Sequence, residues 1–295
     1  MPSLTELIQV IAPDREEEPE DIFASAPGLI FPDDLLNHHG DAESTIVYKS
    51  RRFGDIELTV ADPQGEDERQ LFSHYLWNAG VKMAELVSGA DDAGEAEGEE
   101  GGKGRKWSVK GQTVLELGAG VGLGGIVASL AGAKEVVISD YPAPVVLENA
   151  RKNATKAIPQ DLSHVYHIEG HEWGDFSTSF AESNKQHFTT ILAADCLWMP
   201  HQHVNLIHSM LHFLTLNPTG RIFVLAGFHT GRAKLAAFFE TAVEQSLMVE
   251  EIYEEDSDGA RREWQPERDG GREDPTGRKR WLVIARLKRN EHEDG

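Results

Sequence analysis

The stretch Thr113-Val-Leu-Glu-Leu-Gly-Ala-Gly-Val-Gly-Leu-Gly-Gly125 decides the fold of this chain. Its first part is apolar except for Glu116, which is typical of a strand buried on both faces. Gly118, Gly120 and Gly122 then alternate, which allows a tight turn and a close approach of a ligand to the backbone. The apolar residues beyond the turn follow the period of a helix packed on a sheet: Leu123, Ile126, Val127, Leu130 and Ala131. The stretch therefore predicts the first half of a nucleotide-binding βαβ unit.

A carboxylate follows the second predicted strand. The run Glu135-Val-Val-Ile-Ser-Asp140 ends about 20 residues past the glycine turn, where a doubly wound fold places its ribose-binding acid. A carboxylate accepts hydrogen bonds from both ribose hydroxyls. The alternative role for Asp140 is a helix N-cap, because Tyr141-Pro142 leads into a second predicted helix. The two roles are compatible with each other.

The spacing of the glycines bears on which nucleotide binds. The dinucleotide-binding fingerprint is G-x-G-x-x-G/A. If it opened at Gly118, its third glycine position would be Leu123, which does not fit. If it opened at Gly120, all its glycines would fit, but the motif would start too late after the strand for a pyrophosphate turn. The pattern Glu116-Leu-Gly118-Ala119-Gly120 instead resembles the first motif of the seven-stranded S-adenosylmethionine (AdoMet) methyltransferases. The resemblance implies that these residues bind AdoMet, the methyl donor, and that S-adenosylhomocysteine is the product. The alternative is that this glycine turn binds no ligand.

The alternation of apolar runs predicts the fold class. Strands are expected at residues 113–117, 135–140, 164–169, 188–195, 220–226, 248–253 and 281–287, with helices between most of them. This order indicates an α/β, doubly wound, Rossmann-like sheet of seven strands that ends in an antiparallel hairpin. Ligands of such sheets bind outside the carboxyl ends of the strands, where Gly118, Asp140 and Asp195 all fall.

The remaining chain divides into an extension and insertions. Residues 1–70 are predicted as a helix opened by the capping box Ser3-Leu-Thr-Glu6, an acidic connector and a β-hairpin. The domain itself should span 71–288 and begin with a helix from Leu71 to Val87. Two polar segments, at about 88–106 and about 254–278, are predicted as disordered insertions. Residues 289–295 are predicted as a polar tail.

Composition narrows the class of protein. The 295 residues carry 28 Lys and Arg against 50 Asp and Glu, a net charge of −22, so no nucleic-acid partner is expected. Such a surface would favour a basic substrate, but acidic segments are more often solvated tails than docking sites, and that is the default interpretation. Cys196 is the one cysteine, which excludes an intrachain disulfide. With no apolar run long enough for a bilayer and no signal peptide, we expect a cytoplasmic monomer without membrane contacts.

From Leu71 to Leu287 the chain resembles methyltransferase family 16, seven-stranded protein methyltransferases that act mostly on lysine. Leu76-Trp77-Asn78-Ala79-Gly80 is similar to the family's pre-core helix, whose Trp lies against the cofactor. Glu172-Trp173-Gly174 resembles the Trp-Gly step on the adenine side. Ala194-Asp195-Cys196-Leu197-Trp198 matches the Asp-x-x-Tyr/Phe motif, with Trp in place of a phenol or phenyl ring.

The resemblance implies an activity and roles. Leu76 to Gly80 and Gly28-Leu-Ile-Phe-Pro32 look most like the fungal group that methylates the N-terminal α-amine and adjacent lysine of translation elongation factor 1-alpha, once labelled nicotinamide N-methyltransferase-like. Trp77, Trp173 and Ala194 would then contact the cofactor, Asp195 would lie near the substrate amine, and Trp198 would line the channel. Helix capping is the alternative for Asp195, and core packing is the alternative for Trp77 and Trp173.

The chemistry expected is a direct displacement by a neutral amine. An α-amine has a reference pKa of about 7.7–8.0 and lysine one of about 10.4, so an N-terminal substrate needs no strong base. The sequence offers no obvious catalytic histidine. His201, His203, His208 and His212 complete no metal-binding pattern. Two other classes stay open: a small-molecule N-methyltransferase, and a non-catalytic AdoMet-binding module.

Overall fold

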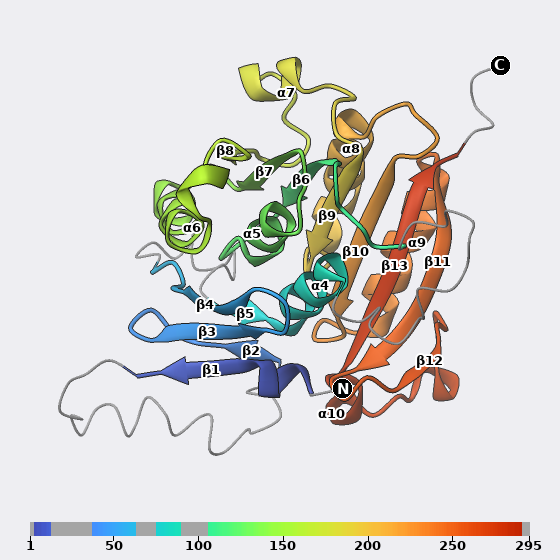
Figure 1. Ribbon diagram of the computed structural model, residues 1–295. Helices are drawn as coiled ribbons and strands as arrows, with labels where there is room; N and C mark the ends of the chain where they lie inside the picture. The colour runs from blue at the N-terminus through green and yellow to red at the C-terminus, as the bar shows by residue number, and fades with distance from the viewer. Residues whose placement is uncertain (1–2, 13–36, 63–74, 90–105, 291–295) are drawn as a thin grey trace, which may run out of the picture.

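The computed structural model describes residues 3–12, 37–62, 75–89 and 106–290. Its centre is an eight-stranded sheet in the order β12-β11-β13-β10-β9-β6-β7-β8 (Figure 1). The five strands from β10 to β8 are parallel to their neighbours, whereas β13 runs antiparallel between β10 and β11. The strands are β6 (Thr113–Leu117), β7 (Glu135–Asp140), β8 (Tyr166–Gly170), β9 (Thr190–Ala194), β10 (Arg221–Gly227), β11 (Leu247–Asp256), β12 (Arg261–Glu263) and β13 (Trp281–Arg289). The predicted doubly wound, seven-stranded order is confirmed, and the short β12 is an addition at one edge.

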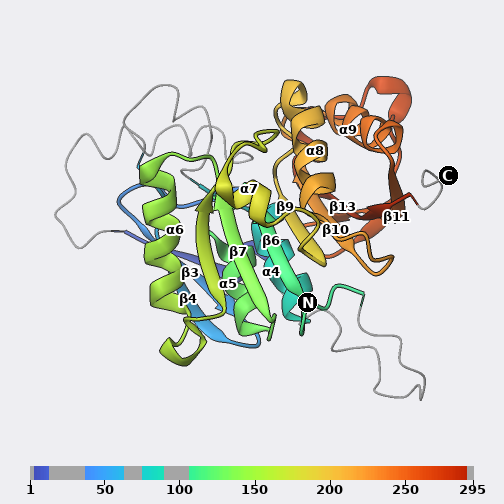
Figure 2. The same cartoon turned by 90° about the horizontal axis from the view of Figure 1, so that it is seen from above.

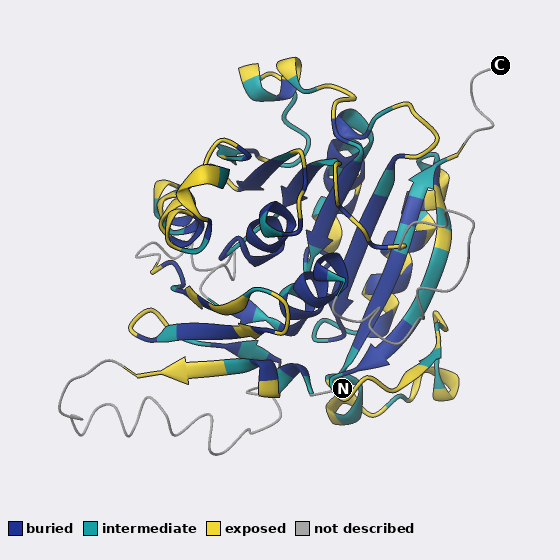
Figure 3. Ribbon diagram, in the orientation of Figure 1, coloured by how far each residue is buried: buried dark blue, intermediate teal, exposed yellow. Residues whose placement is uncertain are grey.

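Helices cover both faces of this sheet (Figure 2). Alternate strand residues enter different cores: Val114 packs with the α4 and α5 side, and Leu115 with the α8 and α9 side. The central strands β6, β7, β9 and β10 are buried along most of their length, while α6 exposes its outer face (Figure 3). The helices are α4 (Asn78–Ser88), α5 (Leu123–Leu130), α6 (Pro144–Ala157), α7 (Ser179–Ser183), α8 (His203–Phe213) and α9 (Arg232–Glu244).

The N-terminal extension differs from the predicted helix. The capping box exists, with Ser3 N donating to Glu6 Oε2 at 2.8 Å, but it opens only the 3-10 turn η1 (Leu4–Leu7). The next residues form strand β1 (Ile8–Ile11), which pairs antiparallel with β3 (Thr45–Ser50) of the predicted hairpin. The helix prediction over these residues is wrong, because β-branched side chains favour a strand and the edge of β3 offers backbone partners. The hairpin is confirmed, with β4 (Gly54–Leu58) on the other side of β3.

The start of the domain also differs from the prediction. Leu76 and Trp77 form the short strand β5 (Leu76–Trp77), which pairs with β2 (His38–His39), and the helix begins only at Asn78. Asn78 N donates to Asn37 O at 2.9 Å, so the strand pairing continues to the helix boundary. A helix through Trp77 is therefore wrong, and residues 71–74 lie outside the described residues. The extended backbone of Trp77, with ψ 150°, carries its side chain toward the carboxyl ends of the sheet.

The predicted insertion at 254–278 has defined structure, in contrast to the expected disorder. Strand β11 continues to Asp256, and β12 and the helix α10 (Pro275–Arg278) follow. Buried Arg232 holds the segment, since its guanidinium lies 2.5 Å from Glu254 Oε1 and 2.6 Å from Glu273 Oε1. Composition predicted the polarity of this segment but not its pairing with Arg232.

Other predictions fall on residues that the structure does not describe. The acidic connector, the stretch Gly28 to Pro32, residues 90–105 of the first insertion and residues 291–295 of the tail lie outside the described ranges. Strand β13 reaches Arg289, the first residue of the predicted tail. Among the described helices, none combines the length and apolar character needed to cross a bilayer.

Candidate active site

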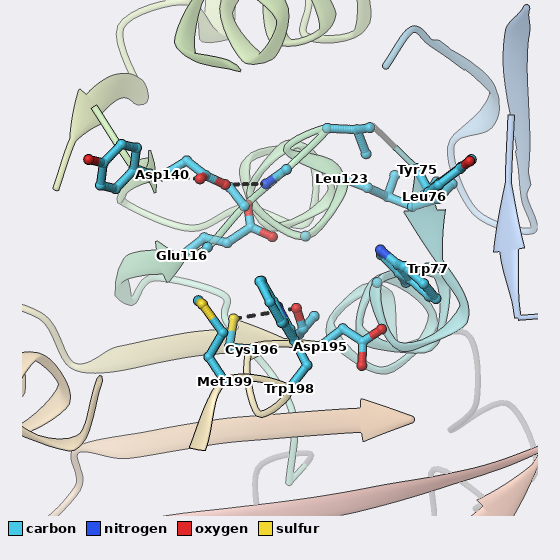
Figure 4. A pocket seen from close by; sticks show the side chains of 18 of the residues that line it. Tyr75, Leu76, Trp77, Glu116, Leu123, Asp140, Asp195, Cys196, Trp198 and Met199 are labelled. Atoms are coloured by element: carbon cyan, nitrogen blue, oxygen red, sulfur yellow. Dashed lines mark hydrogen bonds between the residues drawn. The ribbon is translucent and has the colours of Figure 1, made fainter. Parts of the chain in front are cut away.

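A cavity of about 290 Å³ opens outside the carboxyl ends of β6, β7, β9 and β10 (Figure 4). Loops after these four strands and after β8 supply most of its walls, and β5 supplies one side. All ten residues that the sequence predicted for the site line this cavity: Trp77, Glu116, Gly118, Ala119, Gly120, Asp140, Trp173, Ala194, Asp195 and Trp198. The structure thus brings the whole predicted set together, while the role of each residue stays a prediction.

The glycine loop after β6 has a conformation that glycine supports. Gly118 and Gly120 have φ angles of +64° and +55°, in the left-handed region. A Cβ on Gly118 would lie 2.7 Å from Cys196 Sγ and 3.1 Å from the Trp173 ring. A Cβ on Gly120 would meet no heavy atom within 4 Å. The loop is therefore packed tightly at its first glycine and open at its second.

Asp140 fixes this loop from the end of β7. Its Oδ2 accepts from Gly120 N at 2.6 Å, and its Oδ1 accepts from Tyr141 N at 2.7 Å. Burial raises the pKa of the carboxyl group, and these two hydrogen bonds oppose that rise. The capping alternative is wrong, because the N-cap of α6 is Ala143. Each carboxylate oxygen keeps acceptor capacity, which suits the hydroxyls of a ribose.

Glu116 lies beneath the same loop. It is buried, and its Oε2 accepts from Gly125 N, in the first turns of α5, at 2.8 Å. Burial raises the pKa of Glu116 to about 8, and the nearby charge of Asp140 adds to the rise. Its carboxyl group thus ties α5 to β6 below the cavity.

Asp195 occupies the loop directly after β9. Its φ of +59° is unusual for a residue other than glycine, and its carboxylate extends from this loop toward the Trp77 side of the cavity (Figure 4). Asp195 Oδ1 accepts from Gly227 N at 3.0 Å. Capping does not explain this acid, because Met199 precedes the 3-10 turn η4 (Pro200–Gln202). The carboxylate is instead held at the wall of the cavity.

His229 is a site residue that sequence reasoning missed. Its Nε2 lies 2.9 Å from Asp195 Oδ2, although 34 positions separate the two residues. The sequence offered no obvious catalytic histidine, and the structure places His229 in the lining of the cavity. His229 follows β10 by two residues, and its position near the carboxyl end of a predicted strand was the available signal.

Aromatic rings form much of the remaining wall. Trp77 lies between two histidines, with its ring centroid 4.7 Å from His229 and 5.2 Å from His38. Trp173 packs against the core of the α8 side, as the packing alternative predicts, and also lines the cavity, so its predicted site role stays a prediction. Trp198 lies on the Asp195 side of the cavity (Figure 4). The cavity is thus largely apolar, with a few fixed polar groups, as ligand sites usually are.

Cys196 and the histidines of α8 serve packing and local hydrogen bonds. Cys196 is buried and its Sγ donates to Leu117 O at 3.2 Å, which confirms its predicted core position. His203 donates to Leu197 O at 2.9 Å, and His212 donates to Ala181 O at 2.8 Å. Within the described ranges, no three His, Cys, Asp or Glu side chains come close enough together to hold a metal ion.

The sheet order and the cavity together define a class of protein. The open glycine loop, the ribose-type acid at the end of β7 and the aromatic walls fit a nucleoside such as that of AdoMet. These features indicate an AdoMet-dependent methyltransferase of the doubly wound type.

Comparison with known proteins gives the family. The family model for lysine methyltransferases matches residues 57–245, and the chain belongs to this family. A Schizosaccharomyces pombe protein named "Protein N-terminal and lysine N-methyltransferase efm7" is 30% identical over 214 residues, which are 68% of this chain and 77% of that protein. A Candida glabrata protein of the same name is 31% identical over 62% of this chain and 66% of its own length. The chain is thus an AdoMet-dependent methyltransferase, as predicted.

Similar solved structures include two other methyltransferases. The mitomycin 7-O-methyltransferase MmcR has a TM-score of 0.47 and 15% identity, over 77% of this chain and 58% of that one. The ribosomal protein L11 methylase of Lactobacillus delbrueckii subsp. bulgaricus has a TM-score of 0.42 and 19% identity, over 72% and 80%.

Proposed function

We propose that this enzyme methylates the N-terminal α-amine, the adjacent lysine, or both, of translation elongation factor 1-alpha. The observation that carries the proposal is the Asp195 carboxylate, held in the cavity wall among the aromatic side chains that line the cavity. The names of the two fungal relatives, protein N-terminal and lysine N-methyltransferases, support the reaction type. The resemblance of the segment from Leu76 to Gly80 to the fungal elongation-factor enzymes supports the substrate.

The β6 and β7 side of the cavity would hold AdoMet. Asp140 would accept hydrogen bonds from the ribose hydroxyls, Trp173 would lie on the adenine side, and the Gly118–Gly120 loop would pass close to the ligand. When bound, AdoMet supplies an electrophilic methyl group on its sulfonium. The protein's own part is to orient the ligand and to exclude water.

The β9 and β10 side would bind the substrate amine. Asp195 attracts an ammonium group and orients the nitrogen once the proton is lost, while Trp198 lines the approach. A protein α-amine is partly neutral near pH 7, because its reference pKa is about 7.7–8.0. A lysine, at about 10.4, requires desolvation in the same cavity before it can react.

The net charge of −22 supports a basic protein substrate, since an acidic surface speeds the encounter with one. A protein substrate of the translation machinery places the enzyme in the cytoplasm. We propose that it acts there as a monomer, without direct contact to nucleic acid.

Methyl transfer from labelled AdoMet tests the proposal. Elongation factor 1-alpha with a free N-terminus and the same protein acetylated there would be incubated with the enzyme and with an Asp140→Ala variant. Mass spectrometry would locate the methyl groups. Label at the free N-terminus that disappears on acetylation and in the variant would support the α-amine assignment.

Other outcomes separate the alternatives. Label on the adjacent lysine alone would restrict the activity to lysine. Absence of transfer to both preparations, with AdoMet still bound, would contradict the substrate and direct the search to small amines.

A further inference from the structure

The contact between His229 and Asp195 has no part in the proposed reaction so far. Nε2 of His229 lies 3.0 Å from Oδ1 and 2.9 Å from Oδ2 of Asp195. A carboxylate only accepts hydrogen bonds, so Nε2 carries a hydrogen and donates it. The side chains of His229 and Asp195 are 22% and 8% exposed. The histidine therefore binds the same carboxylate that the substrate amine would use.

One strained residue and one close approach to a glycine accompany this contact. Asp195 adopts a left-handed conformation, with φ +59°, although it is not a glycine. Gly227 permits the ring to fold back over the end of β10, because a Cβ there would lie 2.2 Å from His229 Cε1. Backbone outliers of this kind persist where the surrounding structure fixes them, and they concentrate at functional sites.

The chemistry of the pair depends on the charge of the ring. With a neutral imidazole the pair carries the single negative charge of Asp195, which attracts an ammonium group. With a protonated imidazole the pair has no net charge, and the ring competes with the ammonium for the same oxygens. The imidazole is the side chain whose ordinary pKa allows this change near neutral pH.

Resting on the proposed function, we infer that His229 is a positioning residue for the substrate amine. Its Nε2–H fixes the Asp195 carboxylate at the cavity wall. Protonation of its ring weakens the attraction of that carboxylate for a cationic substrate. The pocket thus accepts the amine well at neutral and higher pH and poorly in acid.

Other charged groups lie near the ring and must be separated from it. His38 and Tyr75 contact the Trp77 ring, which is the ring that packs on His229. Arg278 of α10 lies near Gly231, two residues after His229. Glu116 and Asp140 line the cavity on its other side. Among these, His38 titrates in the same pH range by its ordinary pKa, and Glu116 does so because burial raises its pKa to about 8, so His38→Gln and Glu116→Gln are the matched controls.

The first experiment measures the coupling without any substrate. The imidazole signals of the full-length protein would be followed by NMR from pH 5 to pH 9, and His229→Gln would assign the His229 signal by its loss. In Asp195→Asn the pKa of His229 should fall by about one unit, because the neighbouring negative charge is removed. An unchanged midpoint would overturn the inference.

The second experiment measures the effect on the amine. Two peptides with the N-terminal sequence of elongation factor 1-alpha would be compared, one N-terminally trimethylated and one N-acetylated. The trimethylated peptide keeps its positive charge at every pH. Any pH dependence in the ratio of the two affinities therefore comes from groups of the protein. From pH 8 to pH 6 the preference for the cation should fall about tenfold in the wild type and in His38→Gln.

The variant His229→Gln decides the second experiment. Gln keeps a donor for Asp195 but does not titrate, so in a Glu116→Gln background, which removes the other group titrating in this range, the preference for the cation should stay constant from pH 8 to pH 6. Glu116→Gln with His229 intact should keep the fall. A pH-dependent fall in the double variant, or a constant ratio in the wild type, would overturn the inference. Failure of both peptides to bind would contradict the proposed substrate, whereas the NMR experiment would still show whether the two side chains are coupled.

Discussion

The two sides of the active-site cavity are built in different ways. The β6–β7 side comes from one continuous βαβ unit, in which Asp140 holds the Gly120 backbone 20 positions earlier. The β9–β10 side is assembled from distant segments, with Asp195 bonded to His229 34 positions later and Trp77 packed against that histidine. Local sequence therefore encodes the proposed cofactor side, and the topology of the sheet creates the proposed amine side.

This difference predicts separable effects of substitution. Changes on the β6–β7 side should act on AdoMet binding and on stability, because buried backbone groups depend on those side chains. Changes on the β9–β10 side should act on the protein substrate and leave AdoMet affinity intact.

The largest effect is expected for Asp140→Ala. It removes the ribose acceptor and leaves the N–H groups of Gly120 and Tyr141 without their carboxylate partner. Loss of charged hydrogen bonds of about 1.5–3 kcal/mol each predicts an AdoMet affinity at least about 100-fold weaker, measurable by calorimetry. Asp161→Ala, at an exposed aspartate, is the control and should bind normally. Equal affinities would contradict the ribose role.

A smaller effect on a different quantity is expected for Asp195→Asn. The amide keeps an acceptor for Gly227 N but has lost the charge that attracts an ammonium. We expect kcat/KM for the protein substrate to fall about 30-fold, with AdoMet affinity unchanged. Measuring both quantities on one preparation tests the separation of the two sides. A parallel loss of AdoMet affinity would refute it.

The glycine loop offers a matched pair of variants. Gly118→Ala and Gly120→Ala both place a Cβ at a positive φ, but only the first meets atoms, at 2.7 Å from Cys196 and 3.1 Å from Trp173. Overpacking costs about 1–3 kcal/mol, so Gly118→Ala should be less stable than Gly120→Ala by about that amount. Urea unfolding measures the difference. Equal stability would show that the core around Cys196 yields to the methyl group.

A further prediction concerns the pH dependence of stability and Glu116. Its folded-state pKa of about 8 lies above the ordinary value of 4.5, so the folded protein retains a proton that the unfolded chain releases. The resulting stability is complete below pH 4.5 and is lost as the pH rises through 8. The wild type should therefore lose stability relative to Glu116→Gln across this window in urea unfolding series. Parallel pH dependences of the two proteins would argue against a retained proton.

Where signals were local, the sequence predicted the structure well. The glycine loop, the acid of β7 and the strand order followed from residues close together in the chain, because buried strands and tight turns impose their own composition. The predicted site residues meet in one cavity, because the carboxyl ends of parallel strands share one edge of the sheet.

The predictions from sequence were wrong where the structure of a segment depends on a partner distant in the chain. The apolar spacing at Leu4 to Ile11 suited a helix, but the open edge of β3 makes Ile8–Ile11 a strand. Trp77 likewise joins β5 because His38 supplies its partner. A polar composition suggested disorder at 254–278, yet the buried guanidinium of Arg232 binds the segment through Glu254 and Glu273.

By itself the sequence determined the doubly wound methyltransferase core and the β6–β7 side of its cavity. Only the tertiary structure decided that His229 binds Asp195 beside Trp77. The physical reason is the range of the interactions: the periodicity and turn chemistry of a βαβ unit are local, whereas a contact across 34 positions exists only after the strands have aligned.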